Sequence, residues 1–323
     1  MVSKYSEIFT SVQEEIIQVE RIMRDQMRGN HPDLIAVLDL LLSSGGKRIR
    51  PTITILVGNL LDADKQKILN MAAAIELLHT ATLVHDDLID ESLLRRGVPT
   101  LNSKWSPGAT VLTGDFLFAS AAKIAAKTDS IAVVKQFSEA LIIICNGEIS
   151  QLFNKICTID KDEYFSRIYA KTASLFESSA CCAALISTQG DSCYDHLRTY
   201  GREVGLAFQI VDDILDFTGA QATFGKPIGS DLLHGLITLP TILHTEIYPQ
   251  DPCSQKLLQG ECLTQDEINS FIERIRSGDA VIRALDEAKN HSQAAILALK
   301  DSAPHPSRDA LVNIAEFIID RAF

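Results

Sequence analysis

Apolar residues recur at helical spacing through most of this chain. Three apolar faces show the pattern, and they consist of Leu34, Leu38, Leu41 and Leu42; Phe137, Leu141, Ile144 and Leu152; and Leu311, Ile314, Phe317 and Ile318. Intervals of three and four residues place such side chains on one side of a helix. No alternating run of useful length predicts a strand. The pattern therefore predicts an all-α protein.

Turn and cap residues separate the helical stretches. They fall at Gly45-Gly46, Gly97-Val98-Pro99, Gly225-Lys226-Pro227, Pro249 and Pro304 to Pro306, with Ser307 as a helix N-cap. The segment from about Leu263 onward is charged and amphipathic and carries no motif. We expect it to form outer, scaffolding helices.

Composition favours one large helical domain over residues 1–323. Of the 323 residues, 46% are hydrophobic and 22% are charged, with only 17 Gly and 10 Pro. No Pro-, Gly- or Ser-rich seam divides the chain. The net charge of −12 argues against nucleic acid as a partner.

The N-terminus and the interrupted apolar runs lead us to expect a cytoplasmic protein. The first residues, Met-Val-Ser-Lys-Tyr-Ser-Glu, lack the apolar core of a signal peptide. Charges interrupt the apolar runs well short of a membrane span. The seven cysteines show no CxxC spacing, so we expect buried free thiols.

One aspartate pattern occurs twice, as Asp86-Asp87-Leu88-Ile89-Asp90 and as Asp212-Asp213-Ile214-Leu215-Asp216. Both copies lie in apolar stretches, where unpaired carboxylates are costly and a positive charge must compensate them. A helix turns by about 100° per residue, so positions i and i+4 lie within about 40° of each other. The first and last aspartates of each copy therefore share a helix face. Asp87 and Asp213 point about a quarter-turn away, as supporting groups.

Carboxylate clusters of this kind suit a hard, oxygen-seeking ion. Mg²⁺ usually takes few carboxylates and completes its shell with water and substrate phosphates. His85 adjoins the first copy, whereas the second has no His or Cys beside it. A single copy on a solvated helix face would be unremarkable, but two copies in apolar context predict a Mg²⁺ and diphosphate site between two helices.

Cations near the first motif complement these carboxylates. Lys47, Arg48 and Arg50 follow Gly45-Gly46, and Arg95-Arg96 follows Asp90. Arg presents a planar fork to phosphate oxygens, and Lys a mobile point charge. The alternative is salt bridging to nearby Asp and Glu, to which we assign Arg48. His79 lies two helical turns before Asp86 and is either a core histidine or part of the same site.

With these motifs the chain resembles the trans-prenyltransferases, the all-trans polyprenyl diphosphate synthases of the octaprenyl and solanesyl type. The resemblance runs from about Ser43 to the C-terminus. It rests on Gly45-Gly46-Lys47-Arg48-Ile49-Arg50-Pro51, the run from Glu76 to Asp87, Arg95-Arg96-Gly97, Gly114-Asp115-Phe116, Lys171-Thr172-Ala173, the run from Phe208 to Asp213, and Gly225-Lys226. It implies a bundle of long antiparallel helices around a deep central cavity, in a homodimer.

The resemblance also implies residue roles in a head-to-tail condensation of isopentenyl diphosphate with an allylic diphosphate. Asp86, Asp87, Asp90, Asp212, Asp213 and Asp216 would hold or support Mg²⁺, with Mn²⁺ as a substitute. Arg95, Lys171 and Lys226 would bind the allylic diphosphate, and Lys47, Arg50, His79 and Arg96 isopentenyl diphosphate. Lys171, Thr172 and Gln209 would lie near the reacting carbon. The long product would leave through a peripheral membrane contact.

This chain departs from the family at one position, and two further positions bear on the length of the product. The family commonly has Lys after Gly235, whereas this chain has Leu236, so one diphosphate contact is missing unless Lys226 or His234 replaces it. Ala81 and Thr82, five and four residues before the first motif, stand where bulky aromatics would stop chain growth, and they favour a medium to long product. The alternative is that Ala81 only packs, and that another helix closes the cavity floor.

Other functions remain open. A short-chain synthase that makes farnesyl or geranylgeranyl diphosphate would share these motifs. A non-catalytic subunit of a heteromeric synthase is a further alternative, against which the two intact aspartate clusters count. A terpene cyclase would carry a different second motif.

Overall fold

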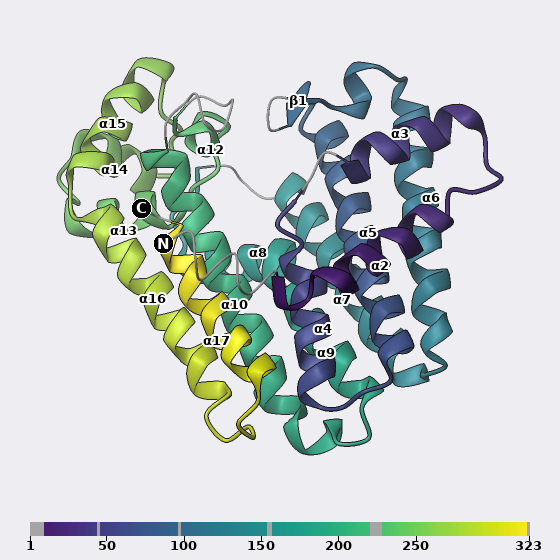
Figure 1. The fold of residues 1–323 in the computed structure, drawn as a ribbon. Coiled ribbons are helices and arrows are strands. Elements are labelled where there is room, and N and C mark those ends of the chain that lie inside the picture. The colour runs from purple at the N-terminus through teal and green to yellow at the C-terminus, as the bar shows by residue number, and fades with distance from the viewer. Residues whose placement is uncertain (1–9, 44–45, 96–97, 154–156, 220–227, 322–323) are drawn as a thin grey trace. The chain divides into compact units, whose positions relative to one another are not determined.

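The computed structural model describes residues 10–43, 46–95, 98–153, 157–219 and 228–321. The predicted all-α class is confirmed (Figure 1). The α-helices are α2 (Gln13–Asp25), α3 (Pro32–Ser43), α4 (Ile49–Leu60), α5 (Lys65–Ile89), α6 (Pro107–Ala125), α7 (Ile131–Phe153), α8 (Lys161–Ile168), α9 (Ser174–Ile186), α10 (Gly190–Thr218), α12 (Ser230–Leu233), α13 (Leu239–Ile247), α14 (Pro252–Leu258), α15 (Gln265–Ser277), α16 (Ala280–Ala298) and α17 (Pro306–Asp320).

Short elements connect some of these helices. Two-residue strands, β1 (Leu94–Arg95) and β2 (Val98–Pro99), form an antiparallel hairpin after the first aspartate motif. The 3₁₀ turns Leu101–Ser103 and Ala126–Thr128 precede and follow α6, and a π-helical turn, Tyr169–Ala173, joins α8 to α9.

The chain forms two compact units. The first comprises residues 1–140, 175–201 and 299–314, and the second comprises residues 141–174, 202–298 and 315–323. The expectation of a single domain over residues 1–323 stays a prediction.

Helix α5 is the core of the first unit, where it packs on α2, α4 and α6 (Figure 1). Asp64 caps its N-terminus by accepting a hydrogen bond from the backbone N–H of Lys67 at 2.9 Å. The residues from Met71 to Ile75 have no exposed surface, and three of them are alanines, so neighbouring helices approach closely. A helix buried on all sides must be apolar all round.

Two helical segments are long and apolar enough to cross a membrane, namely Lys65–Ile89 and Pro107–Thr128. The expectation that charges keep every apolar run short of a span is therefore wrong. Burial explains the composition of the first segment, because 78% of its apolar window lies inside the protein, against 44% for the second.

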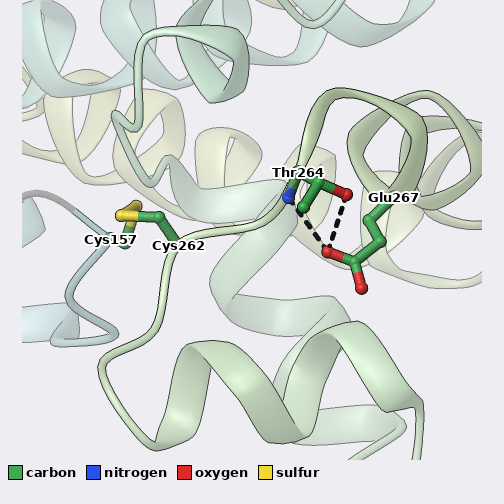
Figure 2. Close-up of a disulfide and its surroundings, with 4 residues drawn as sticks. All are labelled: Cys157, Cys262, Thr264 and Glu267. Atoms are coloured by element: carbon green, nitrogen blue, oxygen red, sulfur yellow. Dashed lines mark hydrogen bonds between the residues drawn. A yellow bond between two sulfur atoms is a disulfide. The ribbon is translucent and has the colours of Figure 1, made fainter.

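The second unit contains a disulfide between Cys157 and Cys262, with Cα atoms 5.4 Å apart (Figure 2). The expectation of seven free thiols is wrong at these two positions; among the others Cys181, Cys182 and Cys253 are buried as predicted. The bond ties the segment after α7 to the loop before α15. At the start of α15 the side chain of Glu267 accepts hydrogen bonds from the backbone N–H and the hydroxyl of Thr264 (Figure 2).

Candidate active site

The first aspartate motif lies at the C-terminal end of α5. The backbone N–H of Asp90 donates to the carbonyl of Asp86 at 2.8 Å, so the helical turn continues through the motif. Asp86 is half-buried and Asp90 is exposed. Asp87 is only 7% exposed, and the guanidinium of Arg95 donates from Nε to its Oδ1 at 2.8 Å. The structure thus brings Asp87 together with Arg95, a predicted ligand of the allylic diphosphate.

The segment that begins α4 supplies the predicted cations. Arg50 Nη1 lies 3.3 Å from His79 Nε2, and the guanidinium stacks over the Phe176 ring at 4.3 Å from its centroid. The predicted isopentenyl diphosphate ligands Arg50 and His79 are therefore neighbours. Lys47 lies on the exposed surface before α4, and Arg96 lies outside the described residues.

Arg48 forms salt bridges, as we predicted from the sequence. Its side chain is mostly buried, however, whereas we expected a surface position. It contacts Glu76 at 2.7 Å and Glu20 at 3.2 Å, and its side chain is 10% exposed. Burial alone would lower the pKa of Arg48, but Glu76 and Glu20 outweigh that effect and raise it. Arg48 therefore anchors α2 to α4 and α5 as a permanent cation.

The second motif lies near the end of α10, in the second unit. Asp216 accepts hydrogen bonds from the hydroxyl of Ser230 at 3.0 Å and from the backbone N–H groups of Ser230 and Asp231 at 3.2 Å. Asp212 forms an ion pair with Arg321 at 2.7 Å. Asp213 is only 3% exposed.

A chain of hydrogen bonds joins Asp213 to the predicted catalytic residues. The hydroxyl of Thr172 donates to Gln209 Oε1 at 2.6 Å, and Gln209 Nε2 donates to Asp213 Oδ1 at 2.9 Å. Tyr164 donates its hydroxyl to Asp213 Oδ2 at 2.7 Å. Burial and, next, the charge of Asp231 raise the pKa of Asp213 to about 8, against the effect of the two hydrogen bonds. The structure thus places Thr172, Gln209 and Asp213 in one network.

Lys171 and Thr172 lie in the π-helical turn between α8 and α9. A π-turn is rare in proteins and occurs frequently at functional sites. Lys171 Nζ lies 2.9 Å from Glu148 Oε1 on α7. A methyl group on Gly147 would meet Ala170 Cβ at 2.6 Å, so glycine lets α7 approach the turn.

The missing family lysine leaves an apolar residue in its place. Leu236 is half-buried, and its backbone N–H donates to the carbonyl of Asp231 at 2.9 Å. His234 is exposed and its Nδ1 lies 2.7 Å from the Ser230 carbonyl oxygen. Lys226, the other residue considered as a replacement, lies outside the described residues.

The two residues predicted to control chain length lie on α5, about one helical turn before the first aspartate motif. Ala81 has no exposed surface, whereas Thr82 is half-buried and donates its hydroxyl to the His79 carbonyl at 2.8 Å. Of the two, Thr82 is the side chain that solvent reaches.

Sequence reasoning missed Tyr164 and Arg321. Tyr164 is one apolar-face residue among many on α8, and Arg321 follows Asp320 near the C-terminus. Neither belongs to a motif, and each lies far along the chain from the aspartate that it contacts. Only the tertiary structure identifies them.

The carboxylates suit a metal ion that shares its coordination with phosphate. Within the part of the chain that the structure describes, no three His, Cys, Asp or Glu side chains group closely enough to hold a metal alone. Mg²⁺ is usually bound by one or two carboxylates together with water and substrate phosphates. Asp86 and Asp90 keep solvent-accessible carboxylates and lie one turn apart, so they fit such a partial site.

Comparison with known proteins places the chain in a family. Residues 31–275 match the family model of the polyprenyl synthetases. A prenyl transferase of Synechocystis sp. is 38% identical over 97% of this chain and 98% of its own length. Component 2 of heptaprenyl diphosphate synthase from Bacillus subtilis is 34% identical, over 99% of this chain and 92% of its own length.

A solved structure agrees with this assignment. The polyprenyl synthase of Caulobacter crescentus, complexed with calcium and isoprenyl diphosphate, superimposes with a TM-score of 0.89 at 32% identity, covering 98% of this chain and 97% of that one. The chain belongs to the polyprenyl synthetase family. It is a prenyltransferase, and its helices have the isoprenoid synthase fold.

Proposed function

We propose that the chain is an all-trans polyprenyl diphosphate synthase that depends on Mg²⁺. It condenses isopentenyl diphosphate head to tail with an allylic diphosphate, and its product is of medium to long chain length. The bond from the allylic carbon to diphosphate breaks, the double bond of isopentenyl diphosphate attacks the resulting cation, and a proton leaves for the departing diphosphate. Charge develops on the leaving group, so cations directed at it accelerate the reaction.

One observation carries this proposal. In both aspartate motifs the second carboxylate is buried and hydrogen-bonded, to Arg95 in the first motif and to Tyr164 and Gln209 in the second. Supporting carboxylates of this kind hold the helix of each motif in position beside the aspartates that we assign to the metal. The two motifs share this arrangement although their partners differ.

Metal binding is the next element of the proposal. The similar Caulobacter protein was solved with calcium, another hard divalent ion that prefers oxygen ligands. For this chain we assign Mg²⁺, with Mn²⁺ as a substitute, to Asp86, Asp90 and Asp212. Mg²⁺ would neutralise charge on the departing diphosphate. As the family resemblance implies, we assign Arg95, Lys171 and Lys226 to the same substrate.

The remaining substrate is isopentenyl diphosphate, which we assign to Lys47, Arg50, His79 and Arg96. The stacking of Arg50 on Phe176 supports this role, because a guanidinium held by an aromatic face is already oriented for a bidentate contact with phosphate.

The proposed length of the product rests on two small residues of this chain and on the name of one relative. Ala81 and Thr82 place no aromatic ring before the first motif, and the Bacillus relative is named for a heptaprenyl product. Helix α5 continues for several turns on the N-terminal side of these positions, so the growing chain could extend along it. We therefore propose a product of about seven to ten isoprene units.

Exposed apolar residues support a homodimer. Leu112 on α6 is 69% exposed and Ile131 on α7 is 77% exposed, and Ile149 and Phe153 farther along α7 are also exposed. Large apolar side chains exposed on long helices are typical of a subunit interface. Sedimentation of the purified protein tests this expectation.

Product analysis of the purified protein tests the proposed function. The protein alone is incubated with Mg²⁺, isopentenyl diphosphate and geranyl, farnesyl or geranylgeranyl diphosphate, and the chains are sized after dephosphorylation. We expect chains of about seven to ten units. Chains of three or four units would indicate a short-chain synthase. No condensation by the pure protein would favour the second candidate, a non-catalytic subunit of a heteromeric synthase. The Bacillus relative is itself named as one component of a synthase.

A further inference from the structure

Helix α6 carries a socket for the side chain that precedes the first aspartate motif. The socket consists of Val111, Gly114, Asp115 and Phe118, which lie on one helix face at intervals of three and four residues. His85 of α5 sits in it. The motif Gly114-Asp115-Phe116 has no part in the proposed chemistry, and the socket is where two of its residues lie.

Each member of the socket makes a contact with the imidazole ring. His85 Nε2 lies 3.1 Å from the Val111 carbonyl oxygen and 3.8 Å from Asp115 Oδ1. The Phe118 ring meets the imidazole edge-on, with centroids 5.3 Å apart. A proton on Nε2 satisfies the Val111 carbonyl, because a carbonyl can only accept.

Gly114 is required by the size of this ring. A Cβ atom at position 114 would lie 2.1 Å from His85 Nε2 and 2.4 Å from its Cδ2, far inside van der Waals contact. Packed interiors do not absorb such an overlap without moving a side chain or a helix. A displaced ring would move His85, and His85 directly precedes Asp86 in the chain.

We propose that His85 is a positioning residue, and that its seating over Gly114 holds Asp86 and Asp90 in place for the metal-bound allylic diphosphate. This inference rests on the proposed function. It assigns the glycine of Gly114-Asp115-Phe116 a role in the geometry of the first aspartate motif without contact with substrate. Arg50 and His79, assigned to isopentenyl diphosphate, are not members of the socket.

A double-mutant cycle tests the proposal. Gly114→Ala should raise the KM for the allylic diphosphate and the Mg²⁺ concentration for half-maximal rate about tenfold, since contact energies of about 1.4 kcal/mol correspond to that factor. The KM for isopentenyl diphosphate should change less than about twofold. Gly108→Ala on the same helix is the control, because nothing lies within 4 Å of its added methyl group.

The second arm removes the ring. His85→Ala should weaken allylic binding by a smaller factor, and adding Gly114→Ala to it should cost nothing further, because the vacated space accepts the methyl group. His85→Gln, which keeps a donor for the Val111 carbonyl, should restore much of the loss. Binding of an unreactive allylic thiodiphosphate, measured calorimetrically with Mg²⁺, provides a readout independent of turnover.

Several outcomes would overturn the proposal. They are an unaltered Gly114→Ala enzyme, additive effects of the two substitutions, or equal losses for both substrates. If Gly114→Ala fails to fold, the comparison of His85→Ala with His85→Gln decides, and equal allylic affinities in these two variants and wild type refute the idea. A wild-type protein without condensation activity would instead refute the proposed function.

Discussion

Arg321 and Asp212 form an ion pair, with 2.7 Å between Nη2 and Oδ1. The guanidinium also lies over the Phe208 ring, 4.5 Å from its centroid. Only 15% of the Arg321 side chain is exposed, so the pair is partly desolvated. A metal ion that binds Asp212 therefore meets a cation already paired with this carboxylate.

Removing the positive charge of Arg321 should strengthen metal binding at Asp212. We expect Arg321→Gln to bind Mn²⁺ more tightly than wild type when no substrate is present, because the positive charge of the guanidinium no longer competes with the metal for Asp212. Electron paramagnetic resonance of free Mn²⁺ measures the affinity. Arg276→Gln, which breaks an exposed pair with Glu273 on α15, is the control and should change nothing. Weaker Mn²⁺ binding by Arg321→Gln would show that the arginine supports the metal site instead.

The cations should separate the two substrates kinetically. Arg50→Ala should raise the KM for isopentenyl diphosphate and leave that for the allylic diphosphate within about twofold, whereas Lys226→Ala should do the opposite. Arg283→Ala, an exposed arginine on α16, is the control. Leu236→Lys, which restores the family lysine, should lower the allylic KM. An Arg50→Ala enzyme with unchanged isopentenyl diphosphate kinetics would contradict the assignment.

Chain length should respond to bulk on α5 before the motif. Ala81→Phe or Thr82→Phe adds a ring to a wall that packed neighbours keep from yielding, so growth should stop at about three or four isoprene units. The first condensation should retain much of its rate. Thr82→Val, which keeps the volume, should make the wild-type product. If both phenylalanine variants gave the wild-type distribution, the floor of the cavity would lie elsewhere.

The disulfide should stabilise the second unit. Cys157 and Cys262 are 105 residues apart, and closing a loop of that length stabilises the folded state by roughly 4–5 kcal/mol in the chain-entropy model. We expect reduction, or Cys262→Ser, to lower the melting temperature. Cys193→Ser, at a partly exposed free thiol, should not. Seven titratable thiols in the denatured, unreduced protein would show that the bond does not form.

Local geometry made part of the site predictable. Helix periodicity alone assigned Asp87 and Asp213 to supporting positions, and both are buried and hydrogen-bonded in the structure. The sequence also predicted that Arg48 forms salt bridges with acidic residues. It did not predict that the Arg48 side chain is mostly buried.

Long-range pairing could not be predicted in this way. Arg321 and Asp212 are 109 residues apart, and the two bonded cysteines lie in different loops. Such contacts depend on how helices pack, and a single sequence records no pairing. Helix α5 is apolar enough to span a membrane although we expected no such run, because a core helix that is buried on all sides has the same composition as a membrane-spanning helix.

The most direct test of the account is the requirement for Mg²⁺ and for both aspartate motifs in a single turnover. Enzyme loaded with an allylic diphosphate is mixed with isopentenyl diphosphate, and released diphosphate and elongated primer are measured in one time course. We expect one diphosphate per new bond, no reaction in EDTA, and rates reduced by about 10²–10³-fold or more in Asp86→Asn and Asp212→Asn, with helical content unchanged. Asp286→Asn, an exposed aspartate on α16, should match wild type. Undiminished elongation in EDTA, or in either motif variant, would contradict the account.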